Sequence, residues 1–132
     1  MVIGSISDVG KIRENNQDAF YASKDLYFPL YMVADGMGGH KAGEVASTMA
    51  RSIIESNFLK AKDNLLHENI IIKLIKESIE EANTKIYLKS LQDEKYKGMG
   101  TTITLAYIFK DKICIGHVGD SRAYLIREGN IC

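Results

Sequence analysis

An apolar run, a glycine-dense turn and a helical pattern follow one another without interruption between residues 30 and 58. Residues 30–34 are a continuous apolar run, which predicts a strand buried on both of its faces. Asp35 opens the turn that follows, and three of the next four residues are glycine. Apolar residues then recur at helical spacing from Gly43 to about Phe58. The chain therefore has to deliver one carboxylate to the end of a strand and turn directly into a helix.

Strand-rich segments lie on both sides of a helical middle section. The clearest helix is predicted over residues 69–91, where apolar residues form one stripe and charged residues lie mostly elsewhere. A polar linker, residues 60–68, separates it from the preceding helix. β-branched and aromatic patterns predict strands at residues 2–7, 19–23, 101–109, 113–118 and 121–127.

The last residues carry a turn signal, Glu128-Gly129-Asn130, of the kind that normally starts a return strand. Only Ile131 and Cys132 follow it. We therefore expect residues 1–132 to be the N-terminal portion of a single domain, cut short within a hairpin.

The composition is that of a soluble globular protein and excludes several classes of function. The chain has 132 residues, which is long enough for one domain with a hydrophobic core. Of these residues, 45% are hydrophobic and 26% are charged. Lys and Arg (17) balance Asp and Glu (17), so the chain has no general attraction to nucleic acid or to an anionic membrane. No apolar run approaches the roughly 20 residues of a membrane span, and the N-terminus lacks the features of a signal peptide. Two cysteines are too few for a disulfide framework, and we expect a cytoplasmic protein.

Three interpretations of the glycine-dense turn are open from the residues alone. A nucleotide site fits poorly, because Glu44 and Val45 follow Gly43 where a phosphate-binding loop needs Lys and Ser or Thr. Asp35 would also repel a bare phosphate. A plain tight turn before a helix is the second interpretation. A metal-binding turn suits the residue types best, with Asp35 as a carboxylate ligand and the carbonyl of Gly36 as a second oxygen ligand.

Four further polar residues, Asp8, Arg13, Asp18 and Asp120, lie in turns or at the ends of apolar runs. The fork of Arg13 matches two phosphate oxygens, although an arginine among carboxylates is also an ordinary salt-bridge partner. Taken alone, Asp18 and Asp120 are each more simply explained as turn residues. The histidines and cysteines show no zinc-like spacing, so oxygen donors dominate and favour Mg²⁺ or Mn²⁺. Together, several carboxylates with one arginine suggest a hard-metal site that handles phosphate.

These residues together resemble the metal-dependent serine/threonine protein phosphatases of type 2C, in their bacterial form. Four motifs carry the resemblance, in family order and over almost the whole chain. One motif alone would be a weak signal, whereas four in order are highly specific. The motifs are Asp8-x-Gly10-x-x-Arg13-x-x-Asn16-Gln17-Asp18, Asp35-Gly36-Met37-Gly38-Gly39 followed by Gly43-Glu44, Gly98-Met99-Gly100-Thr101-Thr102, and Gly119-Asp120-Ser121-Arg122-Ala123-Tyr124.

The resemblance implies an α+β fold, a sandwich of antiparallel β-sheets flanked by helices, which this chain leaves incomplete at its C-terminus. It implies that Asp35 bridges two catalytic Mn²⁺ or Mg²⁺ ions, with the Gly36 carbonyl on one ion and Asp18 near it. Arg13 would hold the substrate phosphate, and Asp120 would match a ligand of a third, weaker metal site. The implied activity is hydrolysis of phosphoserine and phosphothreonine on proteins by a water that bridges the metals.

The ligands in this sequence are few for a catalytic pair of ions, because the family's later aspartates are not in it. We therefore expect activity of an intact parent and none of the 132-residue chain alone. The alternative is a non-catalytic remnant of the fold that binds phosphoproteins or other proteins. The expected partners are phosphorylated proteins, the substrates of a serine/threonine kinase, with no part for nucleic acid or membrane.

Overall fold

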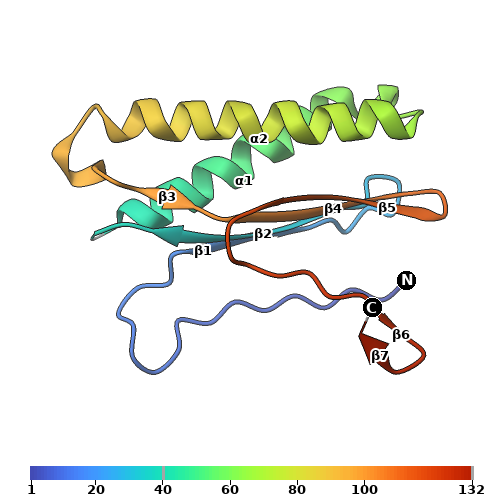
Figure 1. Ribbon diagram of the computed structural model, residues 1–132, viewed down its shortest axis with the longest axis horizontal. Coiled ribbons are helices and arrows are strands. Elements are labelled where there is room, and N and C mark those ends of the chain that lie inside the picture. The colour runs from blue at the N-terminus through green and yellow to red at the C-terminus, as the bar shows by residue number, and fades with distance from the viewer. Residues whose placement is uncertain (40, 132) are drawn as a thin grey trace.

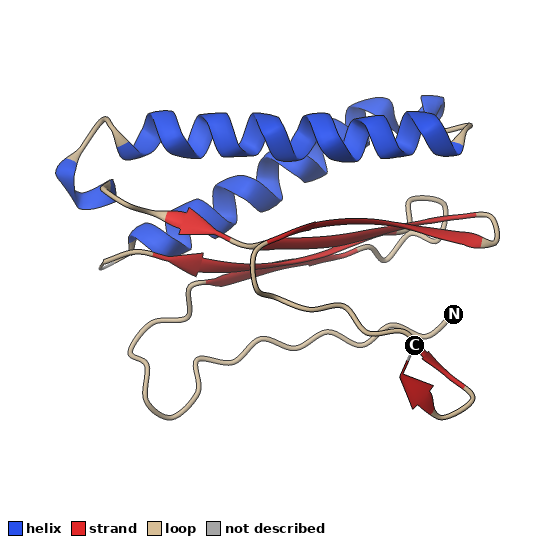
Figure 2. Ribbon diagram, viewed as in Figure 1, coloured by secondary structure: helices blue, strands red, loops and turns tan. Residues whose placement is uncertain are grey.

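Residues 1–39 and 41–131 are described by the structure, a computed structural model. Two long helices lie on one face of an antiparallel sheet, and the two ends of the chain run beneath the opposite face (Figures 1 and 2). In chain order the elements are β1 (Asp18–Ala22), β2 (Leu30–Met37), α1 (Ala42–Ala61), α2 (Glu68–Ser90), β3 (Gly100–Thr101), β4 (Ile103–Phe109), β5 (Lys112–Val118), β6 (Ile126–Arg127) and β7 (Asn130–Ile131), with short 3₁₀ turns at Lys62–Asn64 and Glu94–Tyr96.

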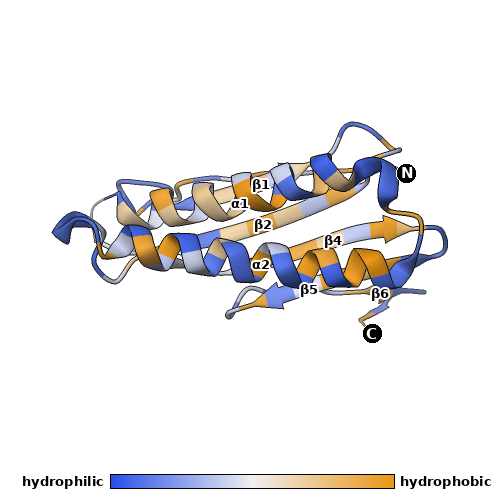
Figure 3. Ribbon diagram, turned by 90° about the horizontal axis from the view of Figure 1, so that it is seen from above, coloured by the Kyte–Doolittle hydropathy of each residue, from blue (hydrophilic) through white to orange (hydrophobic). Residues whose placement is uncertain are grey.

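The arrangement confirms the predicted helical middle section between strands. In the sheet β1, β2, β4 and β5 are neighbours in this order and pair antiparallel, while β3 extends the pairing of β2. α1 lies over β1 and β2, α2 lies over β5, and the two helices pack against each other (Figure 3). Both helices have bounds close to those expected. No described helix is long and apolar enough to cross a membrane.

β2 is buried on one face only, so the prediction of burial on both faces is wrong. Leu30, Met32 and Ala34 point toward the helices and are at most 2% exposed. Val33 alternates with them and is 50% exposed. The reason is that α1 and α2 cover one side of the sheet, and the core lies entirely on that side.

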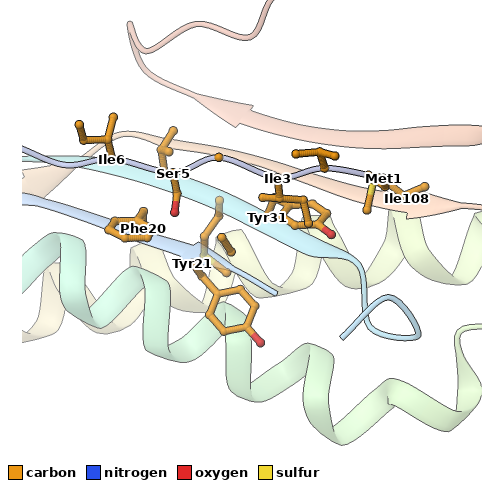
Figure 4. A pocket seen from close by; sticks show the side chains of 13 residues that line it. Met1, Ile3, Ser5, Ile6, Phe20, Tyr21, Tyr31 and Ile108 are labelled. Carbon is orange, nitrogen blue, oxygen red and sulfur yellow. The ribbon is translucent and has the colours of Figure 1, made fainter. Parts of the chain in front are cut away.

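Residues 2–7 are not a strand, although their β-branched residues predicted one. They run as an extended segment across the other face of the sheet (Figure 4), where Ile3 and Ile6 border a cavity of about 490 Å³. Tyr31 of β2 lies on the opposite wall of this cavity. Within the described residues no strand pairs with this segment, and a strand needs such a partner for its backbone hydrogen bonds.

The strand predicted at residues 121–127 is wrong except at Ile126–Arg127. These two residues pair with Asn130–Ile131 in the hairpin β6–β7. Glu128 and Gly129 both have positive φ, 52° and 77°, as a tight hairpin turn requires. The turn signal in the sequence was therefore correct, and the alternating pattern before it was not sufficient to form a longer strand.

The first turn of α1 rests directly on β2 at two glycines. A Cβ atom at Gly36 would lie 2.0 Å from the Gly43 carbonyl oxygen and 2.6 Å from the Gln17 carbonyl oxygen. A Cβ atom at Gly43 would lie 2.3 Å from Gln17 Oε1. Because backbone atoms cannot swing aside as the end of a side chain can, space rather than φ requires glycine at Gly36. This contact fixes where the helix starts relative to the strand.

Gly36→Ala is expected to destabilise the chain by about 3 kcal/mol or more, because the added methyl group overlaps two backbone segments. Gly39→Ala in the same turn is the matched control. Nothing lies within 4 Å of a Cβ atom at Gly39, and this variant should stay within about 0.5 kcal/mol of the wild type. Chemical denaturation followed by circular dichroism measures both. Equal stability of the two variants would show that α1 does not rest on β2 at this point.

Candidate metal and phosphate site

Two carboxylates face each other across the β1–β2 pair. The register of the strands sets Asp18 opposite Asp35. Partial desolvation, then the charge of Asp35 and the closeness of its side chain, raise the pKa of Asp18 above its ordinary value. Two like charges in this position are stabilised by a proton or by a cation between them.

Asp35 lies inside a strand, so the prediction that it opens the turn is wrong. β2 continues through Gly36 to Met37, because β3 pairs with these last two residues. Along its other edge β2 pairs with β1, and Asp35 is the last β2 residue in that pairing. The carboxylate is therefore held by paired strands, whose backbone is stiffer than that of a glycine-rich loop.

The backbone of Gln17 joins β1, β2 and α1 beside the two carboxylates. Its carbonyl oxygen accepts from the Gly36 N–H at 3.0 Å and from Ser47 Oγ at 2.7 Å. Its side chain donates from Nε2 to the Gly38 carbonyl at 3.2 Å. Ser47 is fully buried in α1 and was not identified from the sequence, because α1 has several Ser and Thr residues and no local pattern singles this one out. Asp18, the residue after Gln17, is thereby fixed relative to Gly36.

Arg13 reaches the same place from the loop before β1. It lines a cavity of about 200 Å³ together with Asp18, Asp35 and Gly36. Asp8 also lines this cavity, but its Oδ1 accepts a backbone N–H two residues further along the chain at 2.7 Å and so shapes a turn. None of the ion pairs within the described part of the chain involves Arg13. The structure thus brings together one guanidinium, two carboxylates and a glycine backbone.

Asp120 is the predicted site residue that does not line this cavity. It is exposed, in the turn after β5. Its neighbour Ser121 lines a second cavity of about 200 Å³ with Asp18 and Asp35. Ser121 Oγ lies 2.7 Å from Thr102 Oγ1, which accepts the Asp35 N–H at 3.0 Å. The loop that carries Asp120 is thereby linked to the strand that carries Asp35.

The oxygen atoms that could bind a metal ion here are of the type that a hard divalent cation prefers, but they are few. Carboxylate and carbonyl oxygens are the ligands that Mg²⁺ and Mn²⁺ prefer. Within residues 1–39 and 41–131, no three His, Cys, Asp or Glu side chains are close enough to hold a metal ion together. Asp18 and Asp35, whose mutual repulsion a cation would relieve, are the residues that would hold it, with the Gly36 carbonyl beside them.

Known proteins are similar to this chain in sequence and in fold. The family model described as protein phosphatase 2C matches residues 5–132. The chain belongs to the protein phosphatase 2C family. Relatives of this phosphatase 2C chain include the serine/threonine phosphatase Stp of Listeria welshimeri, 39% identical over 127 residues, and the protein phosphatase PhpP of Streptococcus pneumoniae, 36% identical over 129 residues. The alignments cover 95% and 96% of the chain but 50% and 51% of those proteins. The chain thus spans about half the length of these relatives.

Solved bacterial phosphatases share the fold. The serine/threonine phosphatase of S. agalactiae has a TM-score of 0.87 at 39% identity, over 96% of this phosphatase 2C chain and 52% of that one. The catalytic domain of the phosphatase PstP, solved in complex with two manganese ions, has a TM-score of 0.78 at 32% identity, over 96% of this chain and 51% of that one. These matches confirm the type 2C phosphatase-like α+β fold expected from the sequence.

Asp18→Asn is expected to raise the melting temperature of the metal-free chain at neutral pH, because it removes one of two facing charges. The raised pKa of Asp18 gives the sign: the folded state holds this proton more tightly than the unfolded state. The wild-type carboxyl therefore destabilises the fold once the pH exceeds its folded pKa. The advantage of the variant should disappear below the ordinary value of 3.8, where the group is protonated in both states.

Melting curves in chelator between about pH 3 and pH 8 measure this effect. Asp63→Asn, which also neutralises an exposed aspartate, is the control and should show no such pH-dependent gain. A variant at Asp18 that is less stable than the wild type at neutral pH would contradict the repulsion between the two carboxylates.

Proposed function

We propose that this chain is the metal- and phosphate-binding part of a Mn²⁺- or Mg²⁺-dependent phosphatase that hydrolyses phosphoserine and phosphothreonine on proteins. The observation that supports it most is the meeting of Asp18, Asp35 and Gly36 with Arg13 at one cavity. Oxygen ligands for a cation beside a fork for phosphate are what metal-assisted hydrolysis of a phosphoester needs. The family membership and the two manganese ions named for the PstP domain support the same function.

Each site residue has one task in this proposal. Asp35, with Asp18 and the Gly36 carbonyl, would hold the metal ions. Arg13 binds two oxygens of the substrate phosphate and balances the charge that develops on them in the transition state. Bound Mn²⁺ or Mg²⁺ would supply the charge that lowers the pKa of the attacking water. Asp120 would contribute to a third, weaker metal site from the loop after β5.

The chain alone is expected to turn over little substrate, because two carboxylates fix a pair of ions poorly. The small ligand set among the described residues favours a second function, a non-catalytic module that binds phosphoproteins through Arg13. For either function we propose the phosphorylated substrates of a serine/threonine kinase as partners and the cytoplasm as the location.

A chimera separates the two functions, with this chain replacing the matching half of the L. welshimeri phosphatase. It is expected to release phosphate from a phosphothreonine peptide with Mn²⁺ and not in excess chelator. Asp35→Asn in the chimera should lower kcat by about 10²-fold or more, the usual effect of removing one electrostatic contact at a reacting centre. Asp63→Asn, outside the cavity, is the matched control and should retain activity.

Two results would change the conclusion. Substantial activity of the Asp35→Asn chimera, or full activity in chelator, would contradict the metal-dependent reaction. A folded chimera that binds Mn²⁺ and phosphopeptide without turnover would support the non-catalytic module instead.

Arg13→Ala in the chimera is expected to raise KM for the phosphopeptide by about 10- to 100-fold, the loss of one or two charge-assisted hydrogen bonds. The melting temperature should hardly change, because the exposed side chain contributes little to the core. Lys11→Ala removes a like charge from the same loop and should leave KM nearly unchanged. A sharp fall in melting temperature with normal KM would identify Arg13 as a structural salt-bridge residue.

A further inference from the structure

The hydrogen-bond ladder of the sheet is interrupted at Thr102, directly opposite Asp35. The register is the same on both sides of the interruption, where β3 and β4 pair with β2. The Thr102 N–H donates to the Asp35 carbonyl at 2.9 Å, as a hydrogen-bonded antiparallel pair requires. No residue is therefore inserted at this point, and only one bond of the pair differs from a regular ladder.

The bond that differs is the one donated by the Asp35 N–H. In a regular pair it would go to the Thr102 carbonyl oxygen, but here it goes to Thr102 Oγ1 at 3.0 Å. The Thr102 carbonyl accepts instead from Thr101 Oγ1 at 2.9 Å. A side-chain hydroxyl thus takes the place of a ladder carbonyl at the residue that carries the proposed metal-binding carboxylate.

The same hydroxyl contacts the loop after β5. Thr102 Oγ1 lies 2.7 Å from Ser121 Oγ. Gly119 packs against the same side chain: it has φ of +106°, and a Cβ atom there would lie 2.7 Å from Thr102 Cγ2. Thr102 is only 5% exposed, so water competes little for its hydroxyl. The loop of residues 119–121, which includes Asp120, is therefore held against the Asp35 strand by one side chain.

A hydroxyl group can serve both contacts at once. It offers one donor and two acceptor positions, so Thr102 accepts the Asp35 N–H and still exchanges a hydrogen bond with Ser121. A valine of the same shape could do neither. Hydrogen bonds that share an atom polarise and strengthen one another, which gives Ser121 a physical route to the bond at Asp35.

We infer that Thr102 is a positioning residue that couples the loop of residues 119–121 to Asp35, so that the loop and the carboxylate strand are ordered together. The inference rests on the proposed function, in which Asp35 is a ligand of the Mn²⁺ or Mg²⁺ ions. Ser121 lines a cavity with Asp18 and Asp35, so the coupled loop also forms part of the wall of the site. The competing explanation is that the hydroxyl only satisfies a buried N–H, in which case Ser121 has no effect on Asp35.

A double-mutant cycle on the 132-residue chain tests this coupling without any activity assay. The variants are Thr102→Val, Ser121→Ala and their combination, and the readout is hydrogen exchange of the Asp35 amide by NMR. Thr102→Val is expected to speed this exchange by about tenfold, the loss of one hydrogen bond. Ser121→Ala should speed it by a smaller factor in the wild-type background and have no effect in the Thr102→Val background.

Two further variants separate the hydroxyl from the shape of the side chain. Thr102→Ser keeps the hydroxyl and should stay near the wild type. Thr104→Val is the matched control on the same strand, because the Thr104 hydroxyl bonds to His117 Nδ1 at 2.9 Å and not to Asp35. It should leave exchange of the Asp35 amide unchanged.

The same samples are titrated with Mn²⁺ while the broadening of the Asp18 and Asp35 amide signals is followed. Thr102→Val and Ser121→Ala are both expected to weaken Mn²⁺ binding, although neither removes a ligand, and Thr102→Ser should restore it. If the wild type shows no broadening, the proposed function fails and the exchange cycle still decides the coupling.

Three results would overturn the inference. One is an equal effect of Ser121→Ala in both backgrounds. Another is Thr102→Ser being as harmful as Thr102→Val. The third result applies if Thr102→Val does not fold: hydrogen exchange of the Asp35 amide in the single variant Ser121→Ala is the same as in the wild type.

Discussion

The candidate site depends on the pairing of β1 with β2, because this pairing sets Asp18 opposite Asp35. A slip of the pair by one residue would turn every β1 side chain to the other face of the sheet. Two features oppose such a slip. The Gln17 carbonyl is bonded to Gly36 and Ser47, and the apolar side of the strand pair is buried against α1. Register, rather than the conformation of a loop, therefore keeps the two carboxylates together.

The one-sided core gives the site its access to solvent. Ile54 and Phe58 of α1 are fully buried, and they belong to one core with the apolar residues of β2 that point toward the helices. Asp35 lies two residues after Val33 and so on the opposite, less covered face. An ion or a phosphate can reach that face without displacing any part of the core. The same division explains why Arg13→Ala and Asp35→Asn should affect binding and turnover more than folding.

The sequence predicted best what depends on residues close together in the chain. The two helices follow from the spacing of apolar residues, and the carboxylate followed by glycines lies near the end of the strand that the apolar run predicted. The failures concern partners that are distant in the chain. Residues 2–7 have the composition of a strand but pair with none of the described strands, and β2 lacks a cover on its second face.

Thr102 and Ser121 lie within motifs that the sequence analysis identified, but the sequence did not predict the hydrogen bonds that they make. Which hydroxyl replaces which ladder carbonyl depends on the relative placement of three strands, and no local pattern encodes it. Ser47 is a similar case, because a buried serine in a helix is informative only when its acceptor is known. For Asp18 the pattern indicated a strand end, and the register then supplied its opposite partner.

The contact between Asp35 and Thr102 joins residues that are 67 positions apart in the chain. β1 and β2, by contrast, are consecutive strands joined by a short connection. Because closing a short loop costs less entropy than closing a long one, we expect the β1–β2 pair to form while Thr102 still belongs to an unfolded segment. The two carboxylates then face each other before the residue that fixes the Asp35 backbone has arrived. In this order of folding, Asp18 and Asp35 come together early. The Asp35 backbone reaches its final geometry later, when β4 pairs with β2.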